Sequence, residues 1–119
     1  MNILIIEDDP GVISFIEKGL KENDFTVKCA SDGKTGLDLA LKEVFDIIIL
    51  DVMMPEISGY DLCYTIKFKS PYKDIPILFL TARNQDMDPR ISKMMGVDYM
   101  HKPFKDKELL AKIKSVMGD

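Results

Sequence analysis

Residues 47–51 read Ile-Ile-Ile-Leu-Asp, a run of four apolar residues that ends in an acid. Two other stretches follow the same pattern: Ile-Leu-Ile-Ile at residues 3–6 precedes Glu7, and Ile-Leu-Phe-Leu at residues 77–80 precedes Thr81. Short runs of branched and aromatic apolar residues are typical of strands buried on both faces, as in a parallel sheet covered by helices. Parallel strands end at one edge of their sheet, so we expect the polar residues that follow these runs to meet there.

Between the apolar runs, strand and helix signals alternate along the chain. Residues 26–30 and 99–101 read as two further strands. Apolar residues at helical spacing predict five helices: Val12, Phe15, Ile16 and Leu20; Gly36, Leu37, Ala40, Leu41 and Val44; Leu62, Cys63 and Ile66; Ile91, Met94 and Met95; and Leu109, Leu110, Ile113 and Val116. With right-handed crossovers, the alternation predicts an α/β fold, a single-domain flavodoxin-like (βα)5 doubly wound parallel sheet with strand order 2-1-3-4-5, over residues 1–119.

Composition fits one ordinary globular domain: the chain has 119 residues, of which 46% are hydrophobic and 30% charged. A net charge of −4 gives no general attraction to nucleic acid. The N-terminal apolar stretch is too short for a signal peptide or a membrane span, so we expect a cytoplasmic protein without membrane contact. Cys29 and Cys63 are expected to be buried free thiols rather than a disulfide or metal site, and the single histidine, His101, a surface or packing residue.

The predicted strand order makes strands one and three neighbours, so Asp8 and Asp51 should face each other. Two carboxylates about 5 Å apart repel by roughly 3 kcal/mol at an effective dielectric constant of about 20, and a divalent cation removes the conflict. Oxygen ligands from Glu7, Asp8 and Asp51, with room for water, suit Mg²⁺. Together with the hydroxyl of Thr81 and the ammonium of Lys102, such a site would bind a phosphoryl group. Alternatively, an acidic strand edge only caps helices or stays solvated.

Five short motifs in order resemble the receiver domains of two-component response regulators. They are residues 5–9 (Ile-Ile-Glu-Asp-Asp), residues 50–55 (Leu-Asp-Val-Met-Met-Pro) with Ser58-Gly59, residues 80–83 (Leu-Thr-Ala-Arg), Asp98-Tyr99, and residues 102–104 (Lys-Pro-Phe). Met53 and Arg83 resemble the transcription-factor (OmpR/PhoB-like) branch of that family. The resemblance implies a phosphoprotein that acts in phosphorelay signal transduction.

This resemblance implies that Asp51 is the phosphoacceptor and becomes 4-aspartylphosphate. The donor would be a phosphohistidine of a sensor histidine kinase or of a histidine phosphotransfer protein, and the reaction would depend on Mg²⁺. Asp8, Asp51 and the backbone carbonyl of Met53 would hold the metal directly, and Glu7 largely through water. Asp9 matches a variable position, so its expected role is that of a loop or helix-capping charge. The domain would catalyse only its own phosphotransfer and dephosphorylation.

The resemblance also implies how the phosphoryl group would be recognised. Lys102, preceding a cis bond to Pro103, would pair with one phosphoryl oxygen, the Thr81 hydroxyl would contact a second, and the backbone N–H of Ala82 a third. Movement of Thr81 toward the phosphoryl group would let Tyr99 swing inward. Phosphorylation would thereby change the face formed by the fourth helix, the fifth strand and the fifth helix.

That face is the expected surface of a possible homodimer, to which Asp98, Glu108 and Lys112 could contribute charges. Kinase docking is expected around the first helix and the loop after Lys102, with Ile13 as an apolar residue left off the core stripe. No nucleic acid is expected to bind this domain itself.

Two other functions are open. A metal-dependent aspartyl-phosphate phosphohydrolase also uses an aspartyl phosphate, but such enzymes commonly place a second acid two residues after the nucleophile, where this chain has Met53. A phosphorylation-independent pseudo-receiver binding module usually lacks the acceptor, the hydroxyl or the lysine. This chain has all three, as Asp51, Thr81 and Lys102.

Overall fold

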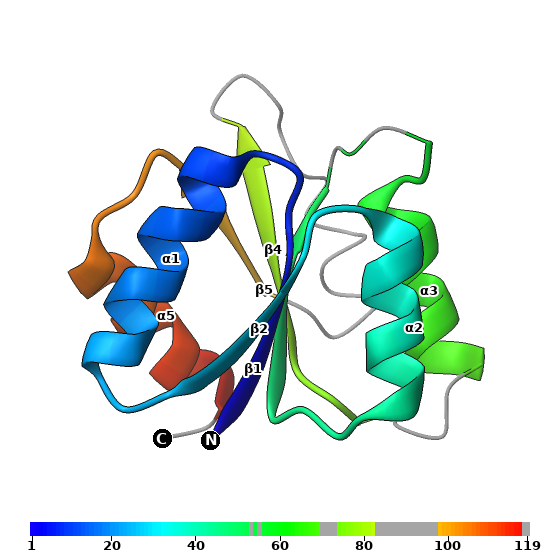
Figure 1. Ribbon diagram of the computed structural model, residues 1–119, viewed down its shortest axis with the longest axis horizontal. Coiled ribbons are helices and arrows are strands. Elements are labelled where there is room, and N and C mark those ends of the chain that lie inside the picture. The colour runs from blue at the N-terminus through cyan, green and yellow to red at the C-terminus, as the bar shows by residue number, and fades with distance from the viewer. Residues whose placement is uncertain (53, 55, 70–73, 83–97, 118–119) are drawn as a thin grey trace.

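A parallel sheet with helices on both faces forms the protein (Figure 1). The computed structural model describes residues 1–52, 54, 56–69, 74–82 and 98–117. In this part of the chain the sheet contains five strands in the order β2-β1-β3-β4-β5, as predicted. The strands are β1 (Asn2–Ile6), β2 (Thr26–Ala30), β3 (Ile47–Asp51), β4 (Ile77–Ala82) and β5 (Asp98–Lys102).

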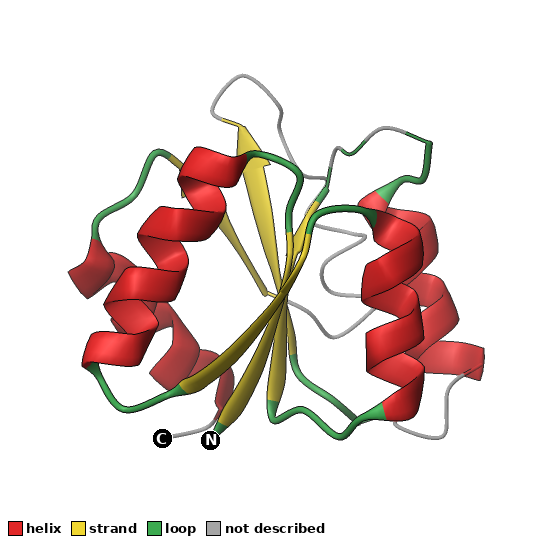
Figure 2. Cartoon of the chain, in the orientation of Figure 1, coloured by secondary structure: helices red, strands yellow, loops and turns green. Residues whose placement is uncertain are grey.

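The described helices are α1 (Pro10–Glu22), α2 (Gly33–Lys42), α3 (Gly59–Lys69) and α5 (Asp106–Met117). Helices α1 and α5 cover one face of the sheet, and α2 and α3 cover the other (Figure 2). The helix expected around Ile91, Met94 and Met95 lies outside the described residues, as do Met53 and Arg83.

The two helical layers explain why the apolar runs have no polar positions. Successive strand residues point to opposite faces. Ile5 and Ile49 therefore pack under α1 and α5, while Ile6 and Leu50 pack under α2 and α3. All residues of β3 are buried, Asp51 included. Burial on both faces thus requires an apolar residue at every position of these runs, and the site begins where the runs end.

Two aspartates cap helices at the N-terminal ends of α1 and α2. Asp9 precedes α1 and accepts a hydrogen bond of 2.8 Å from the backbone N–H of Gly11 through Oδ1, and Pro10 occupies the first turn. Asp32 caps α2 and accepts from the backbone N–H of Thr35 at 2.7 Å, a contact that lowers the pKa of Asp32. The expected capping role of Asp9 is confirmed.

Three apolar residues of the predicted helical stripes are exposed and do not belong to the core, so the prediction was wrong for them. Phe15 is 44% exposed, because Ile16 and Leu20 already fill the core-facing side of α1. Leu41 and Val44 are 40% and 65% exposed. Helix α2 ends at Lys42, so Val44 lies beyond it, and Ala40 takes the buried position beside Leu41.

The two thiols differ in burial. Cys63 is buried and free, as expected, whereas Cys29 is free but only half-buried, which corrects the prediction for that residue. Its Sγ donates to Glu17 Oε2 at 3.2 Å. Burial and the Glu17 carboxylate raise the pKa of Cys29 to about 12, so it is a poor nucleophile at neutral pH.

Position 59, where α3 begins, requires a glycine because it lies against the backbone of Asp51 and Val52. The Gly59 N–H donates to the carbonyl of Val52 at 2.8 Å. A Cβ at Gly59 would overlap the Asp51 carbonyl oxygen and lie 2.7 Å from Val52 Cα, and backbone atoms cannot move aside as a flexible side chain can. We expect Gly59→Ala to lower the free energy of unfolding by about 2–3 kcal/mol in urea titrations.

Gly11→Ala is the matched control, because its Cβ would meet only the Asp9 side chain at 3.2 Å. Equal stability of the two variants would show that the loop after β3 can relax, and would contradict the prediction.

Candidate functional site

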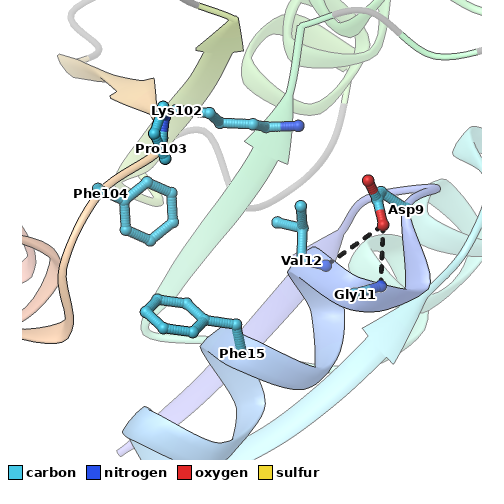
Figure 3. A pocket seen from close by; sticks show the side chains of 7 residues that line it. All are labelled: Asp9, Gly11, Val12, Phe15, Lys102, Pro103 and Phe104. Carbon is cyan, nitrogen blue, oxygen red and sulfur yellow. Dashed lines mark hydrogen bonds between the residues drawn. The ribbon is translucent and has the colours of Figure 1, made fainter.

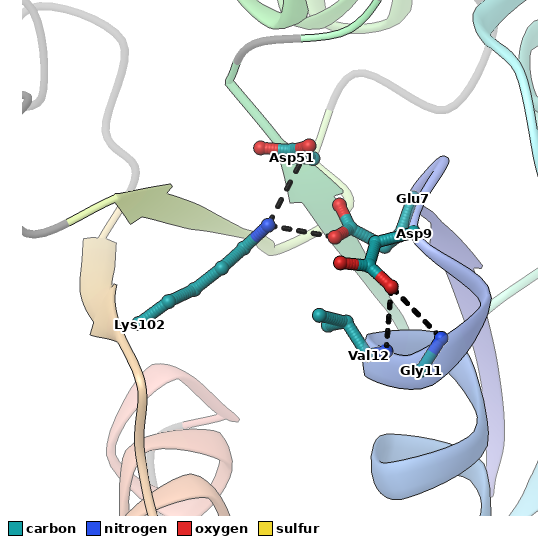
Figure 4. Close-up of polar contacts among 6 residues, drawn as sticks. All are labelled: Glu7, Asp9, Gly11, Val12, Asp51 and Lys102. Atoms are coloured by element: carbon teal, nitrogen blue, oxygen red, sulfur yellow. Dashed lines mark hydrogen bonds and ion pairs between the residues drawn. The ribbon is translucent and has the colours of Figure 1, made fainter.

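The polar residues that follow the apolar runs meet at the carboxyl edge of the sheet. Glu7 follows β1, while Asp51 and Lys102 are the last residues of β3 and β5. The Lys102 side chain reaches from β5 toward the two carboxylates (Figure 4). Its Nζ lies 2.6 Å from Glu7 Oε1 and 3.6 Å from Asp51 Oδ2. The bond between Lys102 and Pro103 is cis, as expected.

Burial makes this cluster electrostatically strained. The Glu7 side chain is fully buried, and only 7% of the Asp51 side chain is exposed. Burial and the adjacent Asp51 carboxylate raise the pKa of Glu7 to about 8. Burial also disfavours the Lys102 ammonium, but the Glu7 and Asp51 carboxylates outweigh that effect and raise the pKa of Lys102. Lys102 therefore keeps its charge, while Glu7 retains a proton more readily than an ordinary glutamate.

The donor set fits a magnesium ion. Glu7, Asp8 and Asp51 each offer a carboxylate oxygen, and these oxygens lie within 4.8 Å of one another. Within the described part of the chain, the buried Oε2 atom of Glu7 has no hydrogen-bond partner. Hard oxygen donors on neighbouring strand ends are the ligands that Mg²⁺ prefers, and the exposed Asp8 leaves a side open for water. The expected carbonyl ligand, Met53, lies outside the described residues.

Thr81 lies on the other side of the sheet from the acids. By strand alternation it shares the face of Phe79, under α2 and α3, whereas Asp51 shares the face of Ile49. Thr81 is 1% exposed, and its Oγ1 lies 2.8 Å from Nδ1 of His101, its register partner on β5. Of the residues expected to contact a phosphoryl group, Lys102 points at Asp51 and the Thr81 hydroxyl is bonded to His101. Ala82 ends β4 beside Lys102.

Two residues at this site were missed in the sequence. His101 is exposed, but its ring bonds to the Thr81 hydroxyl and lies edge-on to Tyr99, with ring centroids 5.6 Å apart. The signal was its position two residues after Tyr99, which places both on one face. Phe15 lines a hollow beside the acidic edge instead of filling the core. The sequence signal for Phe15 was its position one residue before the core residue Ile16, which turns its side chain away from the centre of the buried face of α1.

The hollow has a volume of about 330 Å³ and lies between α1 and the loop after β5 (Figure 3). The rings of Phe15 and Phe104 pack edge to face in it, with centroids 5.9 Å apart. Ile13 is half-buried and does not line it. The lining residues are Asp9, Gly11, Val12, Phe15, Lys102, Pro103 and Phe104.

The raised pKa of Glu7 predicts how stability depends on pH when no divalent cation is added. The pKa of an ordinary glutamate is 4.5, whereas folded Glu7 keeps its proton until about pH 8. Between these values the folded state binds more protons than the unfolded state, so stability decreases as pH rises. We expect the thermal midpoint to fall over this window and Glu7→Gln to flatten the decline. The exposed Glu22→Gln is the control, and an equal slope in wild type and Glu7→Gln would contradict the assignment.

Comparison with known proteins gives a consistent result. Residues 3–114 match the family model of the response regulator receiver domain. The response regulator ArlR of Staphylococcus epidermidis, which is of the OmpR/PhoB family, is 41% identical over 117 residues. The match covers 98% of this chain and 52% of ArlR, so the chain spans about half the length of this relative.

Solved structures agree in fold. The chemotaxis protein CheY4 of Vibrio cholerae superposes with a TM-score of 0.88 at 30% identity, covering 97% of each chain. The receiver domain of the sensor histidine kinase PA1611 of Pseudomonas aeruginosa has a TM-score of 0.85 at 28% identity, covering 99% of this chain and 97% of its own. That structure has a magnesium ion coordinated in its active site cleft.

Within the described residues, no helix has both the length and the apolar character needed to cross a bilayer. The family match spans nearly the whole chain, the relatives agree with it, and the acids and lysine of the family motif meet at one edge of the sheet. The chain belongs to the family of response regulator receiver domains, as its motifs predict.

Proposed function

We propose that this protein is a phosphorylation-activated signalling switch in which Asp51 accepts a phosphoryl group in a Mg²⁺-dependent reaction. The observation that supports the proposal best is the position of Asp51. Its carboxylate lies at the sheet edge, close to the acids that follow β1 and 3.6 Å from the ammonium of Lys102. A nucleophile that receives an anionic group needs positive charge close by, which the Lys102 ammonium and a metal ion bound by the acids would supply.

In the proposed reaction, a carboxylate oxygen of Asp51 attacks phosphorus while the phosphorus–nitrogen bond of a phosphohistidine breaks. The product is an acyl phosphate, and the electron pair of the broken bond stays on the imidazole nitrogen. Glu7, Asp8 and Asp51 would hold Mg²⁺, which supplies positive charge to the phosphoryl oxygens when bound. Lys102 would exchange its bond to Glu7 Oε1 for one to a phosphoryl oxygen, which its long side chain permits.

The proposed change of shape starts at Thr81. Its hydroxyl would turn from the face of α2 and α3 toward the phosphoryl group, and the backbone N–H of Ala82 would contact another oxygen. Tyr99 is half-buried next to Phe79 and Thr81 in the sheet, so it can respond to the space that Thr81 leaves. Phosphorylation would thus alter the surface around β5 and α5.

Incubation with acetyl phosphate and Mg²⁺ tests the proposal, with intact mass and phosphate release as readouts. A receiver gains one phosphoryl group per chain. A metal-dependent phosphohydrolase would instead release phosphate over many turnovers with little adduct, and a pseudo-receiver would show neither, so both results would contradict the proposal.

The partner would be a sensor histidine kinase or a histidine phosphotransfer protein, and the hollow beside the acidic edge is the proposed docking surface. Phe15 is 44% exposed and lines this hollow together with Lys102, whose ammonium lies 3.6 Å from Asp51. We expect Phe15→Ala to slow phosphotransfer from a phosphorylated kinase at least tenfold without changing phosphorylation by acetyl phosphate. The exposed Phe68, on α3, gives the control Phe68→Ala. Equal slowing with both donors would point to damage at the site instead of lost docking.

A homodimer through the face around β5 and α5 is a further part of the proposal. On that face Lys112 Nζ lies 3.4 Å from Asp98 Oδ2, and both residues line a second hollow, of about 470 Å³, together with Glu108. Such charges can pair between two copies as well as within one. Gel filtration with and without beryllofluoride, a phosphoryl mimic, distinguishes a phosphorylation-linked dimer from a constant monomer. The proposal places the protein in the cytoplasm, with no nucleic acid bound by this domain itself.

A further inference from the structure

The hydroxyl of Thr81 is already engaged in this structure. Its Oγ1 lies 2.8 Å from His101 Nδ1, and the two residues are register partners on β4 and β5. In either tautomer of the imidazole the contact is a hydrogen bond, with the hydroxyl as donor to a bare Nδ1 or as acceptor from Nδ1–H. Because Thr81 is 1% exposed, water cannot easily replace His101 as its partner.

The bond to His101 is on the face opposite to the reacting group. Thr81 and His101 follow the alternation of Phe79 and Tyr99, whereas Asp51 and Lys102 follow that of Ile49 and Met100. To contact a phosphoryl group on Asp51, the Thr81 side chain must rotate about its Cα–Cβ bond. That rotation separates Oγ1 from Nδ1. The hydroxyl therefore cannot serve His101 and the phosphoryl group at once.

We propose that His101 is a positioning residue that holds Thr81 in the unphosphorylated arrangement and so opposes activation of the switch. This inference rests on the proposed function and adds a residue that controls its equilibrium. The hydrogen bond stabilises only the resting state, so it shifts the balance between the two states by its own net strength.

His101 also connects Thr81 to the second switch residue. The Tyr99 ring packs edge-on against the imidazole, with centroids 5.6 Å apart. When the Thr81 side chain rotates away, the His101 imidazole loses this hydrogen bond. The imidazole, which packs against Tyr99, is then free to move. His101 borders a hollow of about 470 Å³ at the edge of the sheet, so water can solvate its ring once the bond has broken. The free-energy cost that His101 adds to activation is then that of the hydrogen bond to Thr81 alone.

The test is the affinity for beryllofluoride in the presence of Mg²⁺, measured by NMR titration of the whole protein. His101→Leu removes both ring nitrogens, and we expect it to bind the mimic about 3–10-fold more tightly, the equivalent of one net hydrogen bond. His101→Asn keeps a polar atom close to the position of Nδ1 and is expected to bind within about twofold of wild type. Rescue by Asn separates the hydrogen bond from a packing effect.

A double-mutant cycle shows whether His101 acts through Thr81. Thr81→Val preserves shape and removes the hydroxyl, so in that background His101→Leu should leave the affinity unchanged. The proposal is overturned if His101→Leu binds the mimic with wild-type or lower affinity, or if the gain persists with Val at position 81. By contrast, if the wild type does not bind beryllofluoride, or if binding survives Asp51→Asn, the proposed function itself fails.

Discussion

Asp51→Asn is expected to take up no phosphoryl group from acetyl phosphate and Mg²⁺ under conditions that modify the wild-type chain once. The amide is nearly the same shape as the carboxylate but lacks the nucleophilic oxygen anion. The substitution also removes one of the three carboxyl oxygen donors that lie within 4.8 Å of one another, which weakens the metal site. Intact-mass spectrometry gives the measurement.

Asp9→Asn is the matched control, because Asp9 lies near the same edge but caps α1, a role that asparagine fills equally well. It should be phosphorylated like wild type. A phosphoryl group on Asp51→Asn would place the acceptor elsewhere, and its loss in both variants would indicate a general effect of charge on the acidic edge.

The same substitution has a second large effect, on thermal stability. Without Mg²⁺ and above about pH 8, where Glu7 is charged, Asp51→Asn should unfold at a higher temperature than wild type, because removing one carboxylate relieves repulsion with Glu7 and Asp8. The variant loses the longer ion pair of 3.6 Å between Asp51 and Lys102, but Lys102 keeps its closer partner, Glu7 Oε1, at 2.6 Å, so we expect the relief of repulsion to outweigh that loss. Added Mg²⁺ should stabilise wild type more than the variant.

Lys102→Met is expected to combine two losses. In the resting state it removes the cation from a pair in which the Glu7 side chain is fully buried and Lys102 is 22% exposed. Breaking a buried pair costs about 3–5 kcal/mol when the remaining charge cannot be neutralised. The raised pKa lets Glu7 take up a proton, so the expected destabilisation near pH 7 is smaller, about 1–3 kcal/mol. Urea titration measures it.

During phosphorylation, Lys102→Met removes the ammonium that lies 3.6 Å from Asp51. A charge-assisted hydrogen bond contributes about 1.5–3 kcal/mol, so the rate of modification by acetyl phosphate should fall about 10–100-fold. Lys107→Met makes the same charge change at an exposed position of α5 and should alter neither quantity. Wild-type kinetics in Lys102→Met would remove Lys102 from the proposed reaction.

Local patterns predicted the fold well because each depends on a few neighbouring residues. Runs of four apolar residues specify strands buried on both faces, and the caps Asp9 and Asp32 specify where two helices begin. The order of the strands follows from the alternation of strands and helices with right-handed crossovers. The predictions failed at Phe15, Leu41 and Val44. Helical periodicity alone does not show where a helix ends or how wide its buried face is.

The sequence by itself determined which residues lie at the carboxyl edge of the sheet, because the end of each apolar run fixes where each strand stops. Only the tertiary structure decided their partners. In the folded protein Lys102 pairs with Glu7, and the Thr81 hydroxyl forms a hydrogen bond with His101 on the opposite face of the sheet. The physical reason is that register between strands sets side-chain partners, and register depends on the packing of both helical layers against the sheet.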